Sequence, residues 1–380
     1  MLCRRPSRRE DGIEINSDSM GAGLRKTTPT LNPLRQSETT FLLGDARDLS
    51  ALEENSIDLI ITSPPYWKKI DYLHPKQIGQ EATPKGYIRS LMACLKQWER
   101  VLKPHGSAFV NIADTYVNRD LAGIPERFML AAQDHGWLIQ HRIVWVKPYG
   151  IPESKPYRLA NRYEFIYHLS RKREIYTNLY GYAAKFGNGF NPGNVWKLRA
   201  ERSKDPHLAP FPDELVERVL TFAAPERVCP QCGKPHLPIV ERTARLNPDR
   251  PQAIRAMQLF EESNLTTEHL AAIRAVGLGD AGKARKIQGD EKNAREVLRL
   301  ANEAKAVLGG YFREFTFPMK AQTGWETCGC PAEPIPATIL DPFAGSGTTL
   351  KVARKLGFRA IGLDLVDYSA PAHESVGSTT

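Results

Sequence analysis

Residues 337–364 read ATILDPFAGSGTTLKVARKLGFRAIGLD, and this stretch decides the fold. It opens with a short apolar run, ATILD at 337–341, which is followed by a glycine-containing turn. The helical pattern TTLKVARKLG comes next and ends at Gly357, and FRAIGLD at 358–364 is a second apolar run. A strand, a helix and another strand in succession need a crossover connection, so the segment predicts two parallel strands of one sheet.

Similar strand patterns occur in the first half of the chain. They are FLLGD at 41–45, IDLIIT at 57–62, SAFVNIAD at 107–114, LIQHRIVWV at 138–146 and YEFIYHL at 163–169. One helical pattern begins at Thr83 and Pro84 and is predicted to stop at Pro104, and a second covers residues 125–135. Strands that alternate with helices predict the α/β class, with a doubly wound, mainly parallel sheet of about seven strands and helices on both faces.

The composition favours a folded protein with a polyanionic partner. Of the 380 residues, 41% are hydrophobic and 25% charged, as in ordinary globular proteins. No apolar run approaches the roughly 18 residues that span a bilayer, and the basic start is not followed by a signal sequence, so we expect a cytoplasmic protein. The net charge of +9 makes nucleic acid the first choice of partner.

Changes in composition and in hydrophobic periodicity divide the chain into predicted regions. Residues 1–37 lack apolar periodicity and predict a disordered lead-in. Helical patterns near 250–262, 265–276 and 292–308 lie between two cysteine pairs and predict an inserted, mostly helical domain. The predicted divisions are 1–37 (lead-in), 38–225 (first part of the α/β domain), 226–336 (insertion), 337–368 (second part of the α/β domain) and 369–380 (flexible tail).

The glycine turn DPFAGSGTT, at 341–349, is the first candidate site. Gly345 and Gly347 permit a tight turn and a close approach of the backbone to a ligand. No lysine follows the last glycine, so a phosphate loop is disfavoured. Asp364 follows Gly345 by 19 residues, where an acidic side chain can bind ribose hydroxyls. The pattern therefore indicates a nucleoside-cofactor site, and the alternative is a plain strand-to-helix connection.

The second candidate site is TSPPYW, at 62–67, directly after a predicted strand. The two prolines fix the backbone and donate no hydrogen bond, so carbonyl oxygens around Ser63 and Pro64 can face a ligand as acceptors. Tyr66 adds a rigid aromatic face. Ligands bind at the carboxyl ends of strands in open α/β sheets, which favours a functional loop over a proline-rich loop with a core tyrosine.

Four cysteines form the third candidate site. The pairs Cys229 with Cys232 and Cys328 with Cys330 can offer four thiolates to one tetrahedral ion, and zinc is the usual occupant of such a set. Four protein ligands leave no open position, so the predicted metal is structural. Free thiols are the alternative, and His236 is a substitute ligand.

The pairing of TSPPYW with DPFAGSGTT resembles the signature motifs of the amino-methylating DNA methyltransferases, which use S-adenosylmethionine. The SPPY form is most similar to the N4-cytosine branch. The catalytic motif precedes the cofactor motif, which resembles the family's β-type arrangement and implies a circularly permuted, Rossmann-like methyltransferase sheet. The similarity covers most of residues 39–225 and 337–368.

The resemblance also implies roles for individual residues. Ser63 and Pro64 would accept hydrogen bonds from the target amino group, and Tyr66 would stack on the flipped base. The implied catalytic residues are Ser63, Pro64, Pro65 and Tyr66. The implied cofactor-binding residues are Asp45, Phe211, Pro212, Asp341, Pro342, Phe343, Gly345, Gly347, Thr348 and Asp364. Cys94 lies opposite or beside the apolar stripe of its helix and has no adjacent proline, so it is predicted to be a small core residue rather than the cysteine nucleophile of ring-carbon methylation.

The resulting prediction is a site-specific enzyme that methylates the N4 amino group of cytosine in duplex DNA, in a restriction-modification or phage-protection context. The implied setting is a bacterial or phage-encoded cytoplasmic protein, with a cognate endonuclease and a homodimer as further partners. The alternatives are the same reaction on the N6 amino group of adenine, a zinc-containing DNA-binding protein without catalysis, and a methyltransferase for RNA or small molecules. Basic residues such as Arg250 and Arg255 give the insertion a predicted role in reading DNA, with a structural cap or an oligomer contact as alternatives.

Overall fold

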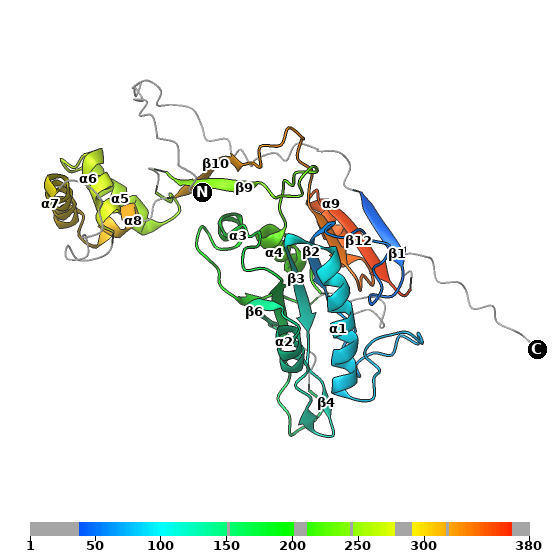
Figure 1. The fold of residues 1–380 in the computed structure, drawn as a ribbon. Coiled ribbons are helices and arrows are strands. Elements are labelled where there is room, and N and C mark those ends of the chain that lie inside the picture. The colour runs from blue at the N-terminus through cyan, green and yellow to red at the C-terminus, as the bar shows by residue number, and fades with distance from the viewer. Residues whose placement is uncertain are drawn as a thin grey trace, which may run out of the picture. The chain divides into compact units, whose positions relative to one another are not determined.

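The computed structural model describes residues 38–149, 153–200, 211–243, 246–277, 291–316 and 319–366. The predicted lead-in and flexible tail lie outside the described residues. Figure 1 shows the large sheet and the helices that lie against it. Within the described residues, no helix is both long enough and apolar enough to cross a membrane.

The large sheet has eight strands, one more than the approximate number predicted. In their spatial order they are β1 (Thr39–Leu43), β12 (Arg359–Asp364), β11 (Thr338–Asp341), β2 (Ile57–Thr62), β3 (Leu102–Ile112), β7 (Tyr163–Ser170), β6 (Leu138–Val146) and β8 (Val195–Lys197). The additional strand is β8, whose three residues are too few for a periodic signal. β7 runs antiparallel to both of its neighbours, and the other pairings are parallel, so the α/β class and the mainly parallel sheet are confirmed.

The order of the strands brings together the two ends of the described chain. β11 and β12, the last strands in sequence, lie between β1 and β2, the first two. β11 pairs with β2 in parallel, with Ile339 opposite Leu59 and Leu340 opposite Ile60. The glycine turn after β11 and the SPPY loop after β2 therefore leave the same edge of the sheet from adjacent strands.

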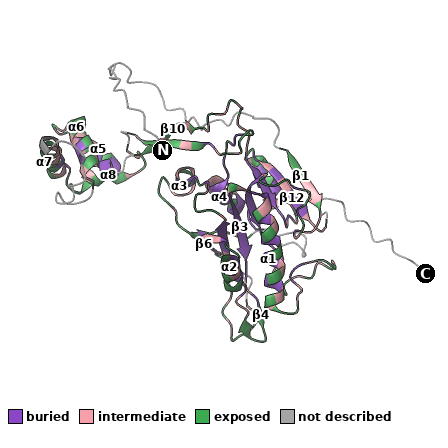
Figure 2. Ribbon diagram, viewed as in Figure 1, coloured by how far each residue is buried: buried purple, intermediate pink, exposed green. Residues whose placement is uncertain are grey.

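Alternate strand residues pack against two separate helical layers. Ile60 and Val110 contribute to the apolar core beneath α1 (Pro84–Val101) and α2 (Ile124–Asp134). Leu59, Ile61 and Phe109 contribute to the core beneath α3 (Leu179–Phe186), α4 (Asp213–Ala223) and α9 (Thr348–Lys355). Figure 2 shows the buried residues concentrated along the central strands, as expected when both faces of a sheet are covered.

The helix α1 begins as predicted and ends before Pro104. The Thr83 hydroxyl accepts a hydrogen bond from the Gly86 amide at 3.1 Å, and Pro84 occupies the first helical position. The helix ends at Val101, and β3 begins at Leu102 and contains Pro104. The predicted stop before Pro104 is therefore confirmed, and the helix ends two residues before Lys103, the residue at which a proline directly disfavours helical backbone.

A buried carboxylate links three strands at the opposite edge of the sheet from the SPPY loop. Asp58 of β2 is 1% exposed and accepts hydrogen bonds from Lys103 Nζ at 2.9 Å and from the Thr338 amide at 2.8 Å. His105 Nε2 lies 2.9 Å from the same carboxylate. These contacts join β2 to the starts of β3 and β11, and they fix the relative register of the strands that carry the two motifs.

The inserted region contains a hairpin and a helical cluster. The hairpin consists of β9 (Leu237–Arg242) and β10 (Lys320–Glu326), and the cluster consists of α5 (Pro251–Glu261), α6 (Thr267–Val276), α7 (Glu291–Leu308), the 3₁₀ turn η2 (Gly309–Tyr311) and α8 (Phe312–Thr316). The cluster has its own apolar core, to which Ile273, Leu308 and Phe315 contribute. A second small hairpin, β4 (Tyr116–Val117) with β5 (Asp120–Leu121), follows β3.

Candidate functional site

A pocket lies at the edge of the sheet where β1, β11, β12 and β2 end. The SPPY loop forms one wall, and the glycine turn forms another. Twelve of the fourteen predicted catalytic and cofactor-binding residues line the pocket: Asp45, Ser63, Pro64, Pro65, Tyr66, Phe211, Asp341, Pro342, Phe343, Gly345, Thr348 and Asp364. Pro212 and Gly347 are not among its lining residues.

Pro212 and Gly347 have backbone positions that account for this difference. Pro212 is the N-cap of α4 and follows Phe211, whose side chain does reach the pocket. Gly347 is the N-cap of α9 and has φ of 78°, a left-handed conformation that side chains disfavour. Gly347 therefore shapes the turn and does not line the pocket.

Asp341 holds the base of the glycine turn. Its carboxylate accepts hydrogen bonds from Thr62 Oγ1 at 2.7 Å, from Thr349 Oγ1 at 2.6 Å and from the Phe343 amide at 3.1 Å. The Thr62 contact connects the end of β11 to the end of β2, next to the SPPY loop. Burial raises the pKa of Asp341 to about 6, although these hydrogen bonds favour the ionised form. One buried carboxyl group thus joins both candidate motifs.

Asp364, at the end of β12, is oriented by the glycine turn. Its Oδ2 accepts a hydrogen bond from the Gly345 amide at 2.8 Å. Burial raises the pKa of Asp364, and its hydrogen bonds with backbone amides oppose this shift. A carboxylate oxygen can accept more than one hydrogen bond, so the group retains capacity for ligand hydroxyls.

Asp45 lies in the same pocket, beyond the end of β1. Burial disfavours its ionised form, but hydrogen bonds from Arg47 lower the pKa of Asp45 overall. The Arg47 guanidinium donates to both of its oxygens, at 2.9 and 2.6 Å. The carboxylates of Asp45 and Asp364 therefore provide two fixed acceptors in the pocket.

The SPPY loop is held in place through its tyrosine. Tyr66 is half-buried, and its hydroxyl donates to Glu164 Oε2 at 2.6 Å and accepts from Asn111 Nδ2 at 2.7 Å. The Ser63 hydroxyl lies 3.2 Å from the same oxygen. Burial, followed by the charge of Glu164, raises the pKa of Tyr66 well above its usual value, so the hydroxyl stays protonated. The ring lines the pocket while its hydroxyl is fixed by β3 and β7.

The segment after the SPPY loop contributes a wall that the sequence analysis did not predict. Its residues at the pocket are Lys69, Ile70, Tyr72, His74, Lys76, Gln77 and Ile78. Burial, together with the nearby charge of Asp364, raises the pKa of Tyr72. The aromatic and basic composition of this segment, directly after a candidate motif, is the signal that could have identified it. Its irregular conformation gives no periodic pattern.

Cys94 is separate from this chemistry. The side chain is fully buried in the core beneath α1, and burial raises the pKa of its thiol. A buried, protonated thiol is a poor nucleophile, so the prediction of a core residue is confirmed.

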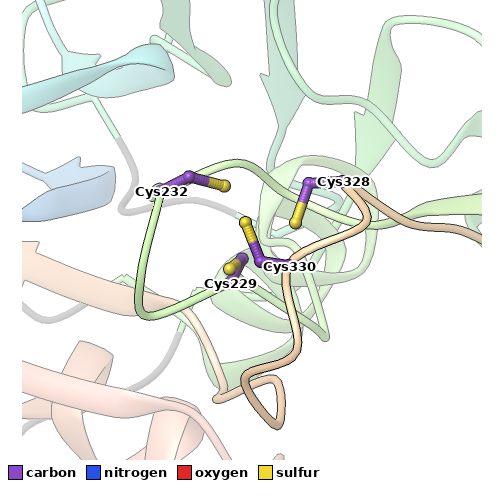
Figure 3. Close-up of side chains that lie close together, drawn as sticks. All are labelled: Cys229, Cys232, Cys328 and Cys330. Atoms are coloured by element: carbon purple, nitrogen blue, oxygen red, sulfur yellow. The ribbon is translucent and has the colours of Figure 1, made fainter.

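The other four described cysteines converge at the base of the insertion. Figure 3 shows Cys229 and Cys232 on one loop facing Cys328 and Cys330 on another. All four sulfur atoms lie within 4.8 Å of one another. In a tetrahedral zinc site with bonds of about 2.3 Å, the sulfur atoms are separated by about 3.8 Å, so the arrangement is close to that of a four-thiolate site. Hydrogen bonding from the Cys232 amide lowers the pKa of Cys229 to about 7, which favours its thiolate.

Backbone pairing brings the two cysteine loops together. Val228 exchanges hydrogen bonds with Ile335 at 2.7 and 2.9 Å, and this bridge joins the start of the insertion to its end. The alternative ligand His236 is buried, and its amide donates to the Arg227 carbonyl oxygen at 2.8 Å. His236 does not belong to the cluster of candidate ligands found within the described residues.

The site unites a glycine turn, two acidic acceptors and an SPPY loop in one pocket, at the carboxyl ends of strands where open α/β sheets bind ligands. The chain matches the DNA methylase family, N6_N4_Mtase, over residues 57–227 and 335–371. It belongs to this family, whose members methylate amino groups of DNA bases.

Two curated relatives show the extent of the similarity. Type II methyltransferase M.Cfr9I of Citrobacter freundii is 32% identical over 219 residues, which cover 48% of this chain and 72% of the relative. Type II methyltransferase M.SfiI of Streptomyces fimbriatus is 28% identical and aligns with 93% of this chain and 94% of its own length. A solved structure of the PvuII cytosine-N4-specific DNA methyltransferase covers 87% of this chain and 83% of its own, with 14% identity and a TM-score of 0.49.

The buried carboxyl group of Asp341 predicts a pH-dependent stability. Burial raises its pKa from 3.8 to about 6, so the folded protein binds a proton more tightly than the unfolded chain. The stabilising contribution of the protonated group is complete below pH 3.8 and is lost as the pH rises through 6, a change of about 3 kcal/mol. Asp341→Asn should lack this loss. Denaturant unfolding of both proteins between pH 4 and pH 7 measures the difference, and parallel pH profiles would contradict the assignment.

Proposed function

We propose that the protein is a site-specific DNA methyltransferase that transfers a methyl group from S-adenosylmethionine to the N4 amino group of cytosine in duplex DNA. The observation that carries the proposal is the single pocket lined by both the SPPY loop and the glycine turn, which lie far apart in the sequence. Methyl donor and acceptor must meet in one place, and this pocket provides it.

The pocket residues fit the proposed cofactor. Asp364 is placed to bind ribose hydroxyls, because its carboxylate is already oriented by the Gly345 amide. Phe343 and Phe211 supply apolar contacts, and Asp45 supplies an acceptor near the end of β1. When bound, S-adenosylmethionine supplies an electrophilic methyl group. The chain itself supplies binding and alignment.

The SPPY loop fits the proposed acceptor. The lone pair of a base amino group is delocalised into the ring, so the group is a weak nucleophile. Ser63 Oγ and the Pro64 carbonyl oxygen accept its hydrogens, which favours a tetrahedral nitrogen and stabilises the positive charge that develops there. The ring of Tyr66 stacks on a base that has been flipped out of the duplex, at a cost of a few kcal/mol.

Serine at the first position of the SPPY sequence supports cytosine N4 as the target, through its resemblance to that branch of the family. Belonging to the family supports duplex DNA as the substrate. The similarity to type II methyltransferases supports a restriction-modification context, with a cognate endonuclease as a functional partner. A phage-protection context and a homodimer fit the same proposal.

We also propose that the four clustered cysteines bind a structural zinc ion. The support is the four sulfur atoms within 4.8 Å and the preference of four thiolates for tetrahedral zinc. Four protein ligands complete the coordination, so the metal supplies cross-linking rather than catalysis. It holds the insertion closed where the chain leaves α4 and returns to β11.

The proposed reaction has a defined product. Purified protein incubated with labelled S-adenosylmethionine should transfer the label to duplex DNA, and nucleoside analysis should identify N4-methylcytosine. N6-methyladenine as the labelled nucleoside would overturn the choice of base. Labelling of RNA but not of duplex DNA would overturn the substrate.

Tyr66→Ala tests the stacking role. Relative to Tyr66→Phe, which keeps the ring, loss of the aromatic face should lower kcat/KM for DNA by roughly 10- to 100-fold, because base stacking on aromatic side chains contributes about 1–3 kcal/mol. The Kd for S-adenosylmethionine should remain nearly unchanged, since the ring contacts the base and not the cofactor. Methylation kinetics and cofactor titration separate the two effects. A large increase in the cofactor Kd would contradict this role.

Replacement of Cys229 and Cys328 by serine tests the metal site. Elemental analysis of the wild-type protein should give one zinc per chain, and the double variant should lose it. Removal of a structural ion should also lower the melting temperature. Cys94→Ala is the matched control, because its thiol is in the core and its removal should leave the zinc content unchanged. Absence of stoichiometric zinc from the wild-type protein would refute the site.

A further inference from the structure

A buried hydrogen-bonded network supports the SPPY loop through residues that do not themselves line the pocket. Its centre is Glu164 of β7, which is 8% exposed. Glu164 Oε2 accepts from the Tyr66 hydroxyl at 2.6 Å and from Asn111 Nδ2 at 2.8 Å. Its other oxygen, Oε1, forms an ion pair with Lys147 Nζ. Strands β3 and β7, the residue that follows β6 and the SPPY loop thus contribute to one cluster.

The chemistry of the donors fixes the direction of each hydrogen bond. An ammonium group has only donors, and the nitrogen of an amide side chain likewise only donates. Asn111 Nδ2 lies within 2.8 Å of both Tyr66 Oη and Glu164 Oε2. If the amide were flipped, its oxygen would face the carboxylate oxygen of Glu164, and neither atom could donate a hydrogen bond. Glu164 accepts throughout, so Tyr66 gives its single hydroxyl hydrogen to Glu164.

This direction determines the state of the Ser63 hydroxyl. Tyr66 Oη has used its hydrogen, so its contact with Ser63 Oγ at 3.2 Å requires Ser63 to donate. Ser63 has one hydrogen as well, and its lone pairs are therefore left to accept from the pocket side. The order of donation runs from Ser63 to Tyr66 to Glu164.

We infer that Glu164 is a positioning residue that sets Ser63 as an obligate hydrogen-bond acceptor, acting through the Tyr66 hydroxyl. The inference rests on the proposed function, because it assigns Ser63 to the target amino group. During transfer the amino nitrogen uses its lone pair to form the new bond to carbon, and the electron pair of the broken bond stays with the leaving sulfur. One amino proton is then lost to solvent. A serine that donated its hydrogen to this nitrogen would oppose the developing positive charge.

Lys147 completes the arrangement by compensating the charge of Glu164. A buried carboxylate without a partner carries a large desolvation cost, and the Lys147 ammonium provides the countercharge in direct contact. Asn111, which is 2% exposed, donates to both the Tyr66 oxygen and the Glu164 carboxylate and so holds the two groups together. The network therefore keeps the Glu164 carboxylate in place as the acceptor of the Tyr66 hydrogen.

Glu164→Gln tests the inference in two backgrounds. The glutamine amide can donate to Tyr66, which removes the fixed direction of donation. With Ser63 present, kcat should fall roughly 10- to 100-fold, the range expected for a hydrogen bond to a charged group, while the cofactor Kd stays unchanged. In the Ser63→Ala background the same substitution should change kcat by less than about twofold, because the hydroxyl it orients is absent. Equal losses in both backgrounds, or no loss in either, would overturn the inference.

Tyr66→Phe provides a second double-mutant cycle with Glu164→Gln. This cycle can be measured even if Ser63→Ala has little residual activity. Tyr66→Phe interrupts the network and keeps the ring, so it should lower kcat as much as Glu164→Gln, and the double variant should show no further loss. Additive losses would show that Glu164 acts by another route. The exposed Glu296→Gln, on α7, is the matched control and should retain wild-type kinetics. A wild-type protein that does not methylate DNA would refute the proposed function itself, a result distinct from either cycle.

Discussion

The parallel pairing of β11 with β2 is the constraint on which the site depends. Their carboxyl ends are adjacent, so the glycine turn and the SPPY loop open into the same space. The hydrogen bond from Thr62 to Asp341, at 2.7 Å, ties the two strand ends at the base of the pocket. At the opposite ends of these strands, Asp58 accepts from the Thr338 amide. Polar contacts at both ends therefore fix a register that the apolar strand residues alone would specify less strictly.

The position of the insertion explains how the sheet tolerates it. The chain leaves the α/β domain after α4 and returns immediately before β11, and Val228 pairs with Ile335 where it leaves and returns. Because this pairing holds the two ends of the insertion together, the length of the inserted segment adds little to the entropic cost of forming the sheet. The cysteine cluster lies beside this bridge, and the helices beyond it have their own apolar core. Several of their arginines are paired, such as Arg250 with Glu314 and Arg299 with Glu303.

The proposed stacking role of Tyr66 combines two requirements that usually conflict. A stacking face must be open to the pocket, whereas a rigid side chain must be packed and hydrogen-bonded. The ring meets the first requirement, and the hydroxyl, bonded to Glu164 and Asn111, meets the second. The hydroxyl of Tyr66 is held by β3 and β7, and its ring lies at the pocket. The geometry of the SPPY loop is therefore set by two strands that carry neither motif.

Most of the strands and helices, and the motifs of the candidate site, could be predicted from the sequence alone. Strand and helix periodicity, the glycine turn, the SPPY loop and the cysteine pairs are local patterns, and local patterns can be read from neighbouring residues. Only the tertiary structure decided the strand order, the exclusion of Pro212 and Gly347 from the pocket, and the wall formed by the segment around Tyr72. The same holds for the partners of Tyr66, since Asn111 comes from β3 and Glu164 from β7. Each depends on contacts between residues far apart in the chain, and no local spacing encodes such contacts.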